Sequence, residues 1–145
     1  MIPYGKHFID EDDIQAVVDV LRNGLLTQGP MVESFERAIA DYVGAKYAVA
    51  VSSGTAALHI SALAAGMGPG KKLITSPITF VASANAGLYA GGEVVFADID
   101  PESINMSPAA LEETLNQNLD TQVVIPVHFA GLPCDMPAIK KIADD

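Results

Sequence analysis

The chain has 145 residues, of which 50% are hydrophobic and 18% charged, and 8 Lys+Arg against 18 Asp+Glu give a formal net charge of -10. The apolar content excludes a disordered or low-complexity chain, and the charged fraction is below the roughly 25% of average soluble domains. The acidic balance lacks the basic patch that nucleic-acid binding needs, so we expect no nucleic acid partner.

Cysteine usage and the N-terminal residues indicate the compartment. The single Cys134 forms no internal disulfide, and no Cys/His cluster suggests a metal site, so we expect a cytoplasmic protein without a metal. The acidic run 10–13 lies where a signal peptide would need its apolar stretch. Polar residues also interrupt the most apolar segment, 47–67, so we expect a soluble chain with no membrane partner.

Two helices are predicted before residue 45. Asp10 can cap the first, in which apolar residues recur at the helical spacing of Ile14, Val17, Val18 and Leu21. Gly29-Pro30 opens the second helix, and Gly44 ends it.

From residue 46 onward, short apolar runs alternate with helical ones, which is typical of βα units in a parallel sheet. The predicted strands are 47–51, 73–76, 94–97 and 123–127, and the predicted helices are 55–65, 81–90, 108–116 and 136–143. We therefore expect an α/β fold in a single structural domain. Acidic Asp144-Asp145 follow the last helix, where such a fold would next supply a strand, so we expect the chain to be part of a longer one.

Ligands of open α/β sheets bind beyond the carboxyl ends of the strands, which draws attention to the loops there. In Ser52-Ser53-Gly54-Thr55, hydroxyls, a glycine and free N–H groups would meet at the positive end of a helix. This arrangement could hold a phosphate, or Ser53 and Thr55 could simply cap the helix. The segment matches neither a Walker loop nor the dinucleotide fingerprint.

The other three loops each allow a functional and a structural interpretation. Phe80 could stack on a flat heteroaromatic ligand or pack in the core. Asp98 and Asp100 could serve metal or acid–base chemistry, although Asp100 before proline is also a common turn opener. His128 could act as an acid, a base or a substrate ligand, or could be hydrogen-bonded under a loop.

Taken together, several loops resemble one family, the pyridoxal-phosphate-dependent sugar-nucleotide aminotransferases often called the DegT/StrS family. The matching segments, in chain order, are Leu26–Pro30, Val51–Leu58, Ser76–Asn85, Phe96–Asp100 and Ile125–Gly131. The first segment and the run Thr75–Asn85 look most like the pseudaminic-acid branch, the UDP-4-amino-4,6-dideoxy-N-acetyl-β-L-altrosamine transaminases.

The resemblance implies a fold-type-I large domain that binds pyridoxal 5′-phosphate. Gly54, Thr55 and Ala56 match the loop that holds the cofactor phosphate, and Phe80 matches the aromatic residue that stacks on the pyridine ring. Residues 1–45 would then be an N-terminal helical segment, and residues 46–145 an incomplete cofactor-binding domain.

The resemblance also implies a reaction, in which an amino group passes from glutamate to C4 of a UDP-linked 4-keto-6-deoxy sugar. Tyr4, Lys6, Thr27 and Gln28 match segments near the sugar-nucleotide site, which is often shared across a homodimer. We therefore expect a UDP-sugar, glutamate and a second copy of the complete chain as partners.

The family's Schiff-base lysine and the aspartate that pairs with the pyridine nitrogen would both lie beyond residue 145. No lysine of this sequence matches the catalytic motif, so we assign no catalytic residue and expect the chain alone to be inactive. In the family's sheet, strands from later in the chain lie between segment 47–51 and the other three strands.

Two alternatives remain open from the sequence. The chain could be a non-catalytic α/β module that binds a phosphorylated ligand or a partner chain. It could also belong to a sugar dehydratase of the same family, in which histidine replaces the Schiff-base lysine, because the deciding position is not among these residues.

Overall fold

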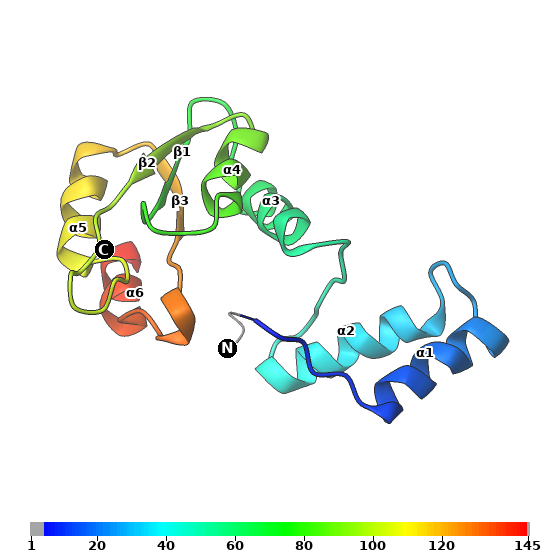
Figure 1. Cartoon of the computed structure of the whole chain (residues 1–145). Helices are drawn as coiled ribbons and strands as arrows, with labels where there is room; N and C mark the ends of the chain where they lie inside the picture. Colours follow the sequence, from blue (N-terminus) through cyan, green and yellow to red (C-terminus); the bar gives the residue numbers. More distant parts are fainter. Residues whose placement is uncertain (1–4, 145) are drawn as a thin grey trace. The chain divides into compact units, whose positions relative to one another are not determined.

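The computed structural model describes residues 5–144, which form two compact units divided between Ala50 and Val51 (Figure 1). The assignment of residues 1–45 and 46–145 to one structural domain stays a prediction. Among the described residues, no helix combines the length and the apolar composition that a membrane span requires.

The first unit contains the two predicted helices, α1 (Glu11–Asn23) and α2 (Pro30–Val43). The Asp10 carboxylate accepts the backbone N–H groups of Asp12 and Asp13, and the Asp13 side chain accepts the Asp10 N–H, which completes a capping box. The second helix has proline in its first turn and ends at Gly44, whose φ of 69° is the left-handed conformation that glycine adopts without strain. Both helices are confirmed.

The second unit is an α/β structure with a small parallel sheet, as predicted. In chain order its elements are α3 (Gly54–Ala64), β1 (Lys72–Thr75), α4 (Ala82–Tyr89), β2 (Glu93–Phe96), α5 (Pro108–Gln117), β3 (Thr121–Ile125), the 3-10 turn η1 (Phe129–Gly131) and α6 (Met136–Asp144). The strands lie in the order β2-β1-β3, and both neighbours of β1 run parallel to it. Three of the four predicted strands are therefore confirmed.

The fourth predicted strand, 47–51, is wrong for this structure, because the segment forms no ladder with any described residue. A strand needs a neighbour to satisfy its backbone groups, and this segment pairs with neither edge strand, β2 or β3. The apolar side chains of the segment are consequently exposed, Tyr47 to 76% and Val49 to 77%.

The core of the second unit lies on both faces of β1, because successive residues of a strand point to opposite faces. Leu73 packs with Ala62 and Ala86 from α3 and α4, whereas Ile74 packs with Leu111 and Ile139 from α5 and α6. Figure 1 shows these two helix pairs on opposite sides of the sheet. The central strand β1 is therefore held rigidly in the core, and this fixes the position of the loop that follows it.

Candidate functional site

The candidate site lies at the carboxyl edge of the sheet. The strands end in register there, since Thr75 is paired with Phe96 on one side and with Ile125 on the other. The loops that follow the three strands carry Phe80, Asp98 to Asp100, and His128 to Gly131. Parallel pairing therefore brings segments 50 residues apart in sequence to one edge.

The start of α3 is open to solvent and offers free backbone donors. Ser53 caps the helix, because its hydroxyl accepts the Ala56 N–H at 3.2 Å and its carbonyl accepts the Ala57 N–H at 3.0 Å. The N–H groups of Gly54 and Thr55 have no acceptor among the described residues. A Cβ placed on Gly54 would meet no atom within 4 Å, so an anion can approach these donors.

The direction of α3 points this open end toward the carboxyl edge. The Gln122 side chain, at the amino end of β3, donates to the carbonyl of Ala65 just after the helix at 2.9 Å. The last turn of α3 therefore lies at the amino edge of the sheet. Leu58, in the first half of the helix, packs against the same core cluster as Ile125, the last residue of β3, so the helix start lies toward the carboxyl edge.

Phe80 lies between β1 and α4 with 73% of its surface exposed. Two hydrogen bonds order the loop that carries Phe80. The buried Ser76 hydroxyl donates to the Ile78 carbonyl at 3.2 Å, and the hydroxyls of Thr79 and Ser83 lie 2.9 Å apart. The ring is thus held on an ordered loop without being covered. This placement excludes the alternative in which Phe80 packs in the core of its unit.

The two aspartates after β2 build a turn. Asp100 accepts the Ser103 N–H at 2.8 Å and the Glu102 N–H at 3.1 Å, and Asp98 accepts the Ile99 N–H at 2.8 Å. The hydrogen bond from the Ser103 backbone holds the pKa of Asp100 below its usual range, and the Ser103 hydroxyl lowers it further. The structural interpretation of this pair is therefore the one that the geometry favours.

His128 follows β3 and is exposed, and its Nδ1 accepts the backbone N–H of Cys134 at 3.1 Å.

The sequence does not indicate the residue that organises this loop, which is Asn105. Its side chain is hydrogen-bonded to three backbone groups between Phe129 and Pro133, and the residue is only 3% exposed. A lone asparagine in a loop carries no periodic signal, so only the fold reveals it.

The residues predicted to lie near a sugar-nucleotide site belong to the first unit. Lys6 is exposed in the segment before α1, and Thr27 and Gln28 are exposed in the loop between α1 and α2. Gln28 has a φ of 51°, a left-handed conformation that is uncommon outside glycine. Tyr4 lies outside the described residues. The roles of all four stay predictions.

Lys72, the first residue of β1, forms an ion pair with an aspartate that precedes β3. Its ammonium lies 3.0 Å from the Asp120 carboxylate before β3, and its side chain is 22% exposed. The hydrogen bond from Lys72 holds the pKa of Asp120 below its usual range. The pair joins the amino ends of two neighbouring strands.

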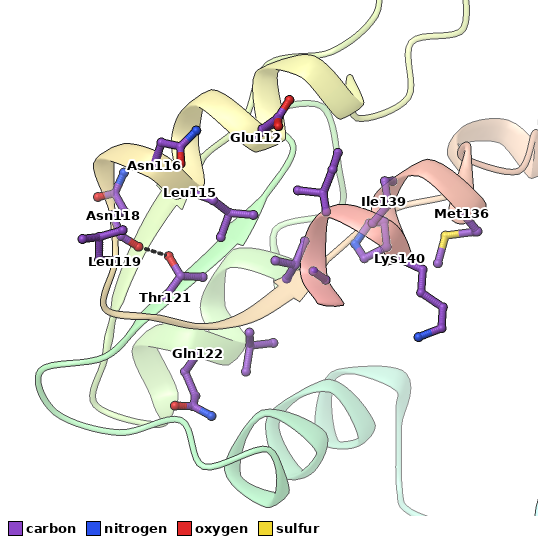
Figure 2. Close-up of a pocket in the computed structure, with 15 residues that line it drawn as sticks. Glu112, Leu115, Asn116, Asn118, Leu119, Thr121, Gln122, Met136, Ile139 and Lys140 are labelled. Atoms are coloured by element: carbon purple, nitrogen blue, oxygen red, sulfur yellow. Dashed lines mark hydrogen bonds between the residues drawn. The ribbon is translucent and has the colours of Figure 1, made fainter. Parts of the chain in front are cut away.

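A cavity of about 730 Å³ lies between α5, β3 and α6 (Figure 2). Its lining includes Leu115 and Ile139, and at one end the Thr121 hydroxyl donates to the Asn118 carbonyl at 2.7 Å. None of the site residues predicted from the sequence contributes to it. The open edge carrying the free N–H groups and Phe80, rather than this cavity, is the candidate site.

Comparison with known proteins identifies the sequences and structures to which this chain is similar. Residues 7–145 match the model of the DegT/DnrJ/EryC1/StrS aminotransferase family. The chain is 45% identical over 144 residues to the spore coat polysaccharide biosynthesis protein SpsC of Bacillus subtilis (strain 168), a match that covers 99% of this chain and 36% of that protein.

Several solved structures are similar to this chain, and two of them illustrate the likeness. Spr1654 from Streptococcus pneumoniae in its PMP form has a TM-score of 0.90 and 33% identity, over 97% of this chain and 35% of that one. The aminotransferase from Psychrobacter cryohalolentis has a TM-score of 0.88 and 32% identity, over 98% of this chain and 36% of that one. The chain thus spans about a third of the length of these relatives.

Proposed function

Because the chain belongs to the DegT/DnrJ/EryC1/StrS aminotransferase family, we propose that it binds pyridoxal 5′-phosphate at the carboxyl edge of its sheet and acts in amino-group transfer. The observation that carries the proposal is the open start of α3, where Gly54 and Thr55 present free N–H groups in the same unit as the exposed Phe80. The PMP form of Spr1654 supports the choice of cofactor.

The residues present fit such a group. Gly54 leaves space for a phosphate over the helix, and the free donors there are the N–H groups of Gly54 and Thr55 and the Thr55 hydroxyl, because the Ala56 N–H already donates to Ser53. These donors would bind and orient the phosphate, and the Phe80 ring would stack on the flat pyridine ring. When bound, the cofactor supplies an electron sink for cleavage and formation of carbon–nitrogen bonds.

We further propose the substrates, which are glutamate and a UDP-linked 4-keto-6-deoxy sugar of the pseudaminic-acid type. The net reaction exchanges the amino group of glutamate, with a hydrogen, for the C4 keto oxygen of the sugar. This choice is supported by the resemblance of segments 26–30 and 75–85 to that branch and by the likeness to a polysaccharide biosynthesis protein. Tyr4, Lys6, Thr27 and Gln28 are the proposed sugar-nucleotide contacts.

The proposal includes a homodimer in the cytoplasm as the working form. No lysine of this chain is assigned the covalent role, because none matches the family's catalytic motif. The chain's own contribution is the phosphate loop and the stacking ring, and we propose that these residues alone bind the cofactor without turnover.

An assay of the protein purified from its native source tests the function. Incubation with pyridoxal 5′-phosphate, glutamate and the UDP-4-keto sugar is expected to give the 4-amino sugar and an equal amount of 2-oxoglutarate by mass spectrometry. Unchanged ketosugar would contradict the proposal. Loss of a sugar hydroxyl without gain of nitrogen would assign the protein to the dehydratases instead.

A further inference from the structure

One buried side chain links the loop after β2 to the loop after β3. Asn105 Oδ1 accepts the Phe129 N–H at 2.9 Å, and its Nδ2 donates to the carbonyls of Leu132 at 3.0 Å and Pro133 at 3.3 Å. Asn105 is only 3% exposed, so these bonds form away from solvent. One amide therefore holds both ends of the turn 129–133.

The turn that Asn105 holds has an unfavourable backbone. Ala130 has a φ of 51°, and a left-handed alanine persists only where its surroundings impose that conformation. The turn itself supplies two backbone hydrogen bonds, from the Gly131 N–H to the His128 carbonyl at 3.2 Å and from the Leu132 N–H to the Phe129 carbonyl at 3.0 Å. Asn105 supplies the remaining polar constraints on this turn.

Closing the turn brings Cys134 back to His128. The Cys134 N–H donates to His128 Nδ1 at 3.1 Å, and the Cys134 Sγ lies 3.1 Å from the Val127 carbonyl. A ring nitrogen that accepts an N–H carries no proton, so the neutral imidazole has its proton on Nε2. Because the ring is exposed at the carboxyl edge, Nε2–H is free to donate to a ligand.

We propose that Asn105 is a positioning residue, which holds the turn 129–133 so that the Cys134 N–H fixes His128 with its proton on Nε2. The site thereby gains an oriented N–H donor beside the edge that carries Phe80. The identity of its acceptor, an oxygen of the cofactor or of the sugar nucleotide, rests on the proposed function. The fixed tautomer of His128 does not depend on the proposed function, because it is a property of the chain without ligand.

The tautomer is measured directly in the 145-residue chain by long-range proton–nitrogen NMR at neutral pH. The expected spectrum of His128 is that of a single Nε2–H tautomer, with His7 and His59 in the same sample as internal references. A proton on Nδ1, or averaging between the two tautomers, would overturn the proposal. The amino-transfer assay is independent of this spectrum, so the two proposals can fail separately.

The role of Asn105 is tested with Asn105→Asp, which keeps the acceptor for Phe129 and removes both donated hydrogen bonds. Asn116→Asp, at an exposed position on α5, adds the same charge as a matched control. We expect loss of the Nε2–H pattern of His128 in the first variant and the unchanged pattern in the second. A folded Asn105→Asp chain with the unchanged pattern would overturn the assignment.

Hydrogen exchange of the unmodified chain covers the case in which Asn105→Asp fails to fold. The Phe129 amide bonds to Asn105 and the Cys134 amide bonds to His128, so opening of the turn should expose both together. Equal protection of the two amides is expected. A Cys134 amide that exchanges at least tenfold faster than that of Phe129 would show that Asn105 does not hold the His128 contact.

Discussion

The exposed ring of Phe80 combines two properties that a stacking residue needs. Its loop is ordered by the Ser76 and Thr79 hydroxyls, and its face is uncovered. A loop held in this way loses little backbone freedom when a ligand binds to the ring, so little of the stacking energy is spent on ordering the loop.

Replacing this ring should weaken cofactor binding. Stacking contributes about 0.5–1.5 kcal/mol, so Phe80→Leu is expected to raise the Kd for pyridoxamine 5′-phosphate by about 2- to 12-fold. Phe80→Tyr keeps the ring and should bind like the unmodified chain. Isothermal titration calorimetry measures the Kd of the unmodified chain and of both variants. If Phe80→Leu binds as tightly as the unmodified chain, the ring does not stack on the ligand.

The Asp100 turn gives a pH dependence with a defined sign. Its pKa is lowered in the folded chain, so its stabilising contribution is complete above the usual carboxyl pKa and is lost as the pH falls through the lowered value. Asp100→Asn should therefore lower the Tm at neutral pH, and the difference from the unmodified chain should shrink in acid. Glu102→Gln, an exposed neighbour of the same charge, is the control. A Tm difference that stays constant down to the acid range would contradict this account.

The sequence predicts the residues of the site where residue type alone suggests the chemistry. The hydroxyls and glycine at 52–55 and the aromatic ring at Phe80 could be identified in this way. Asn105 could not, since its function depends on a loop 24 or more residues away. The ion pair of Lys72 with Asp120 was hidden for the same reason, because only strand pairing brings the two together.

At the level of elements, α4 lies unusually close to the sheet. A Cβ on Gly87 would lie 3.0 Å from Leu73 Cβ and 3.1 Å from Val94 Cγ2, and Leu73 is fully buried in the central strand. The glycine therefore lets the helix that follows the Phe80 loop approach β1 and β2 closely. Fixing α4 in this way also fixes the end of that loop.

Gly87→Val should separate α4 from the sheet. Overpacking of a filled core costs about 1–3 kcal/mol, and we expect a loss of that size in the free energy of unfolding measured with urea. Gly68→Val is the matched control, because a Cβ at Gly68 would meet no atom within 4 Å. Equal stability of the two variants would show that the close approach of α4 is not required.

Helices were predicted well because their signals are local. Asp10, Gly44 and Ser107 cap or end helices where the sequence indicates, and the boundaries agree to within one residue for most of them. The strand 47–51 failed because its composition is that of a buried strand, while a strand forms only where a neighbour is available. That condition depends on the whole sheet and cannot be read from the segment.

Across the whole molecule, large apolar side chains are exposed in both units. Phe8 is 85% exposed in the first unit, and Leu119 is 89% exposed in the second. Exposed apolar surface of this extent is typical of sites at which a protein binds another protein or a further part of its own fold. We expect the 145-residue chain to bind a hydrophobic dye and to elute from size-exclusion columns above its 15.2 kDa in a concentration-dependent manner. A monomer without dye binding would contradict this expectation.

The central claim is that the start of α3 holds the phosphate of the cofactor. The most direct measurement is an NMR titration of the chain that follows the backbone amides of Gly54 and Thr55, with pyridoxamine 5′-phosphate compared with pyridoxamine. We predict saturable shifts of both amides only with the phosphorylated compound. Equal shifts with both compounds, or none at these two amides, would contradict the account.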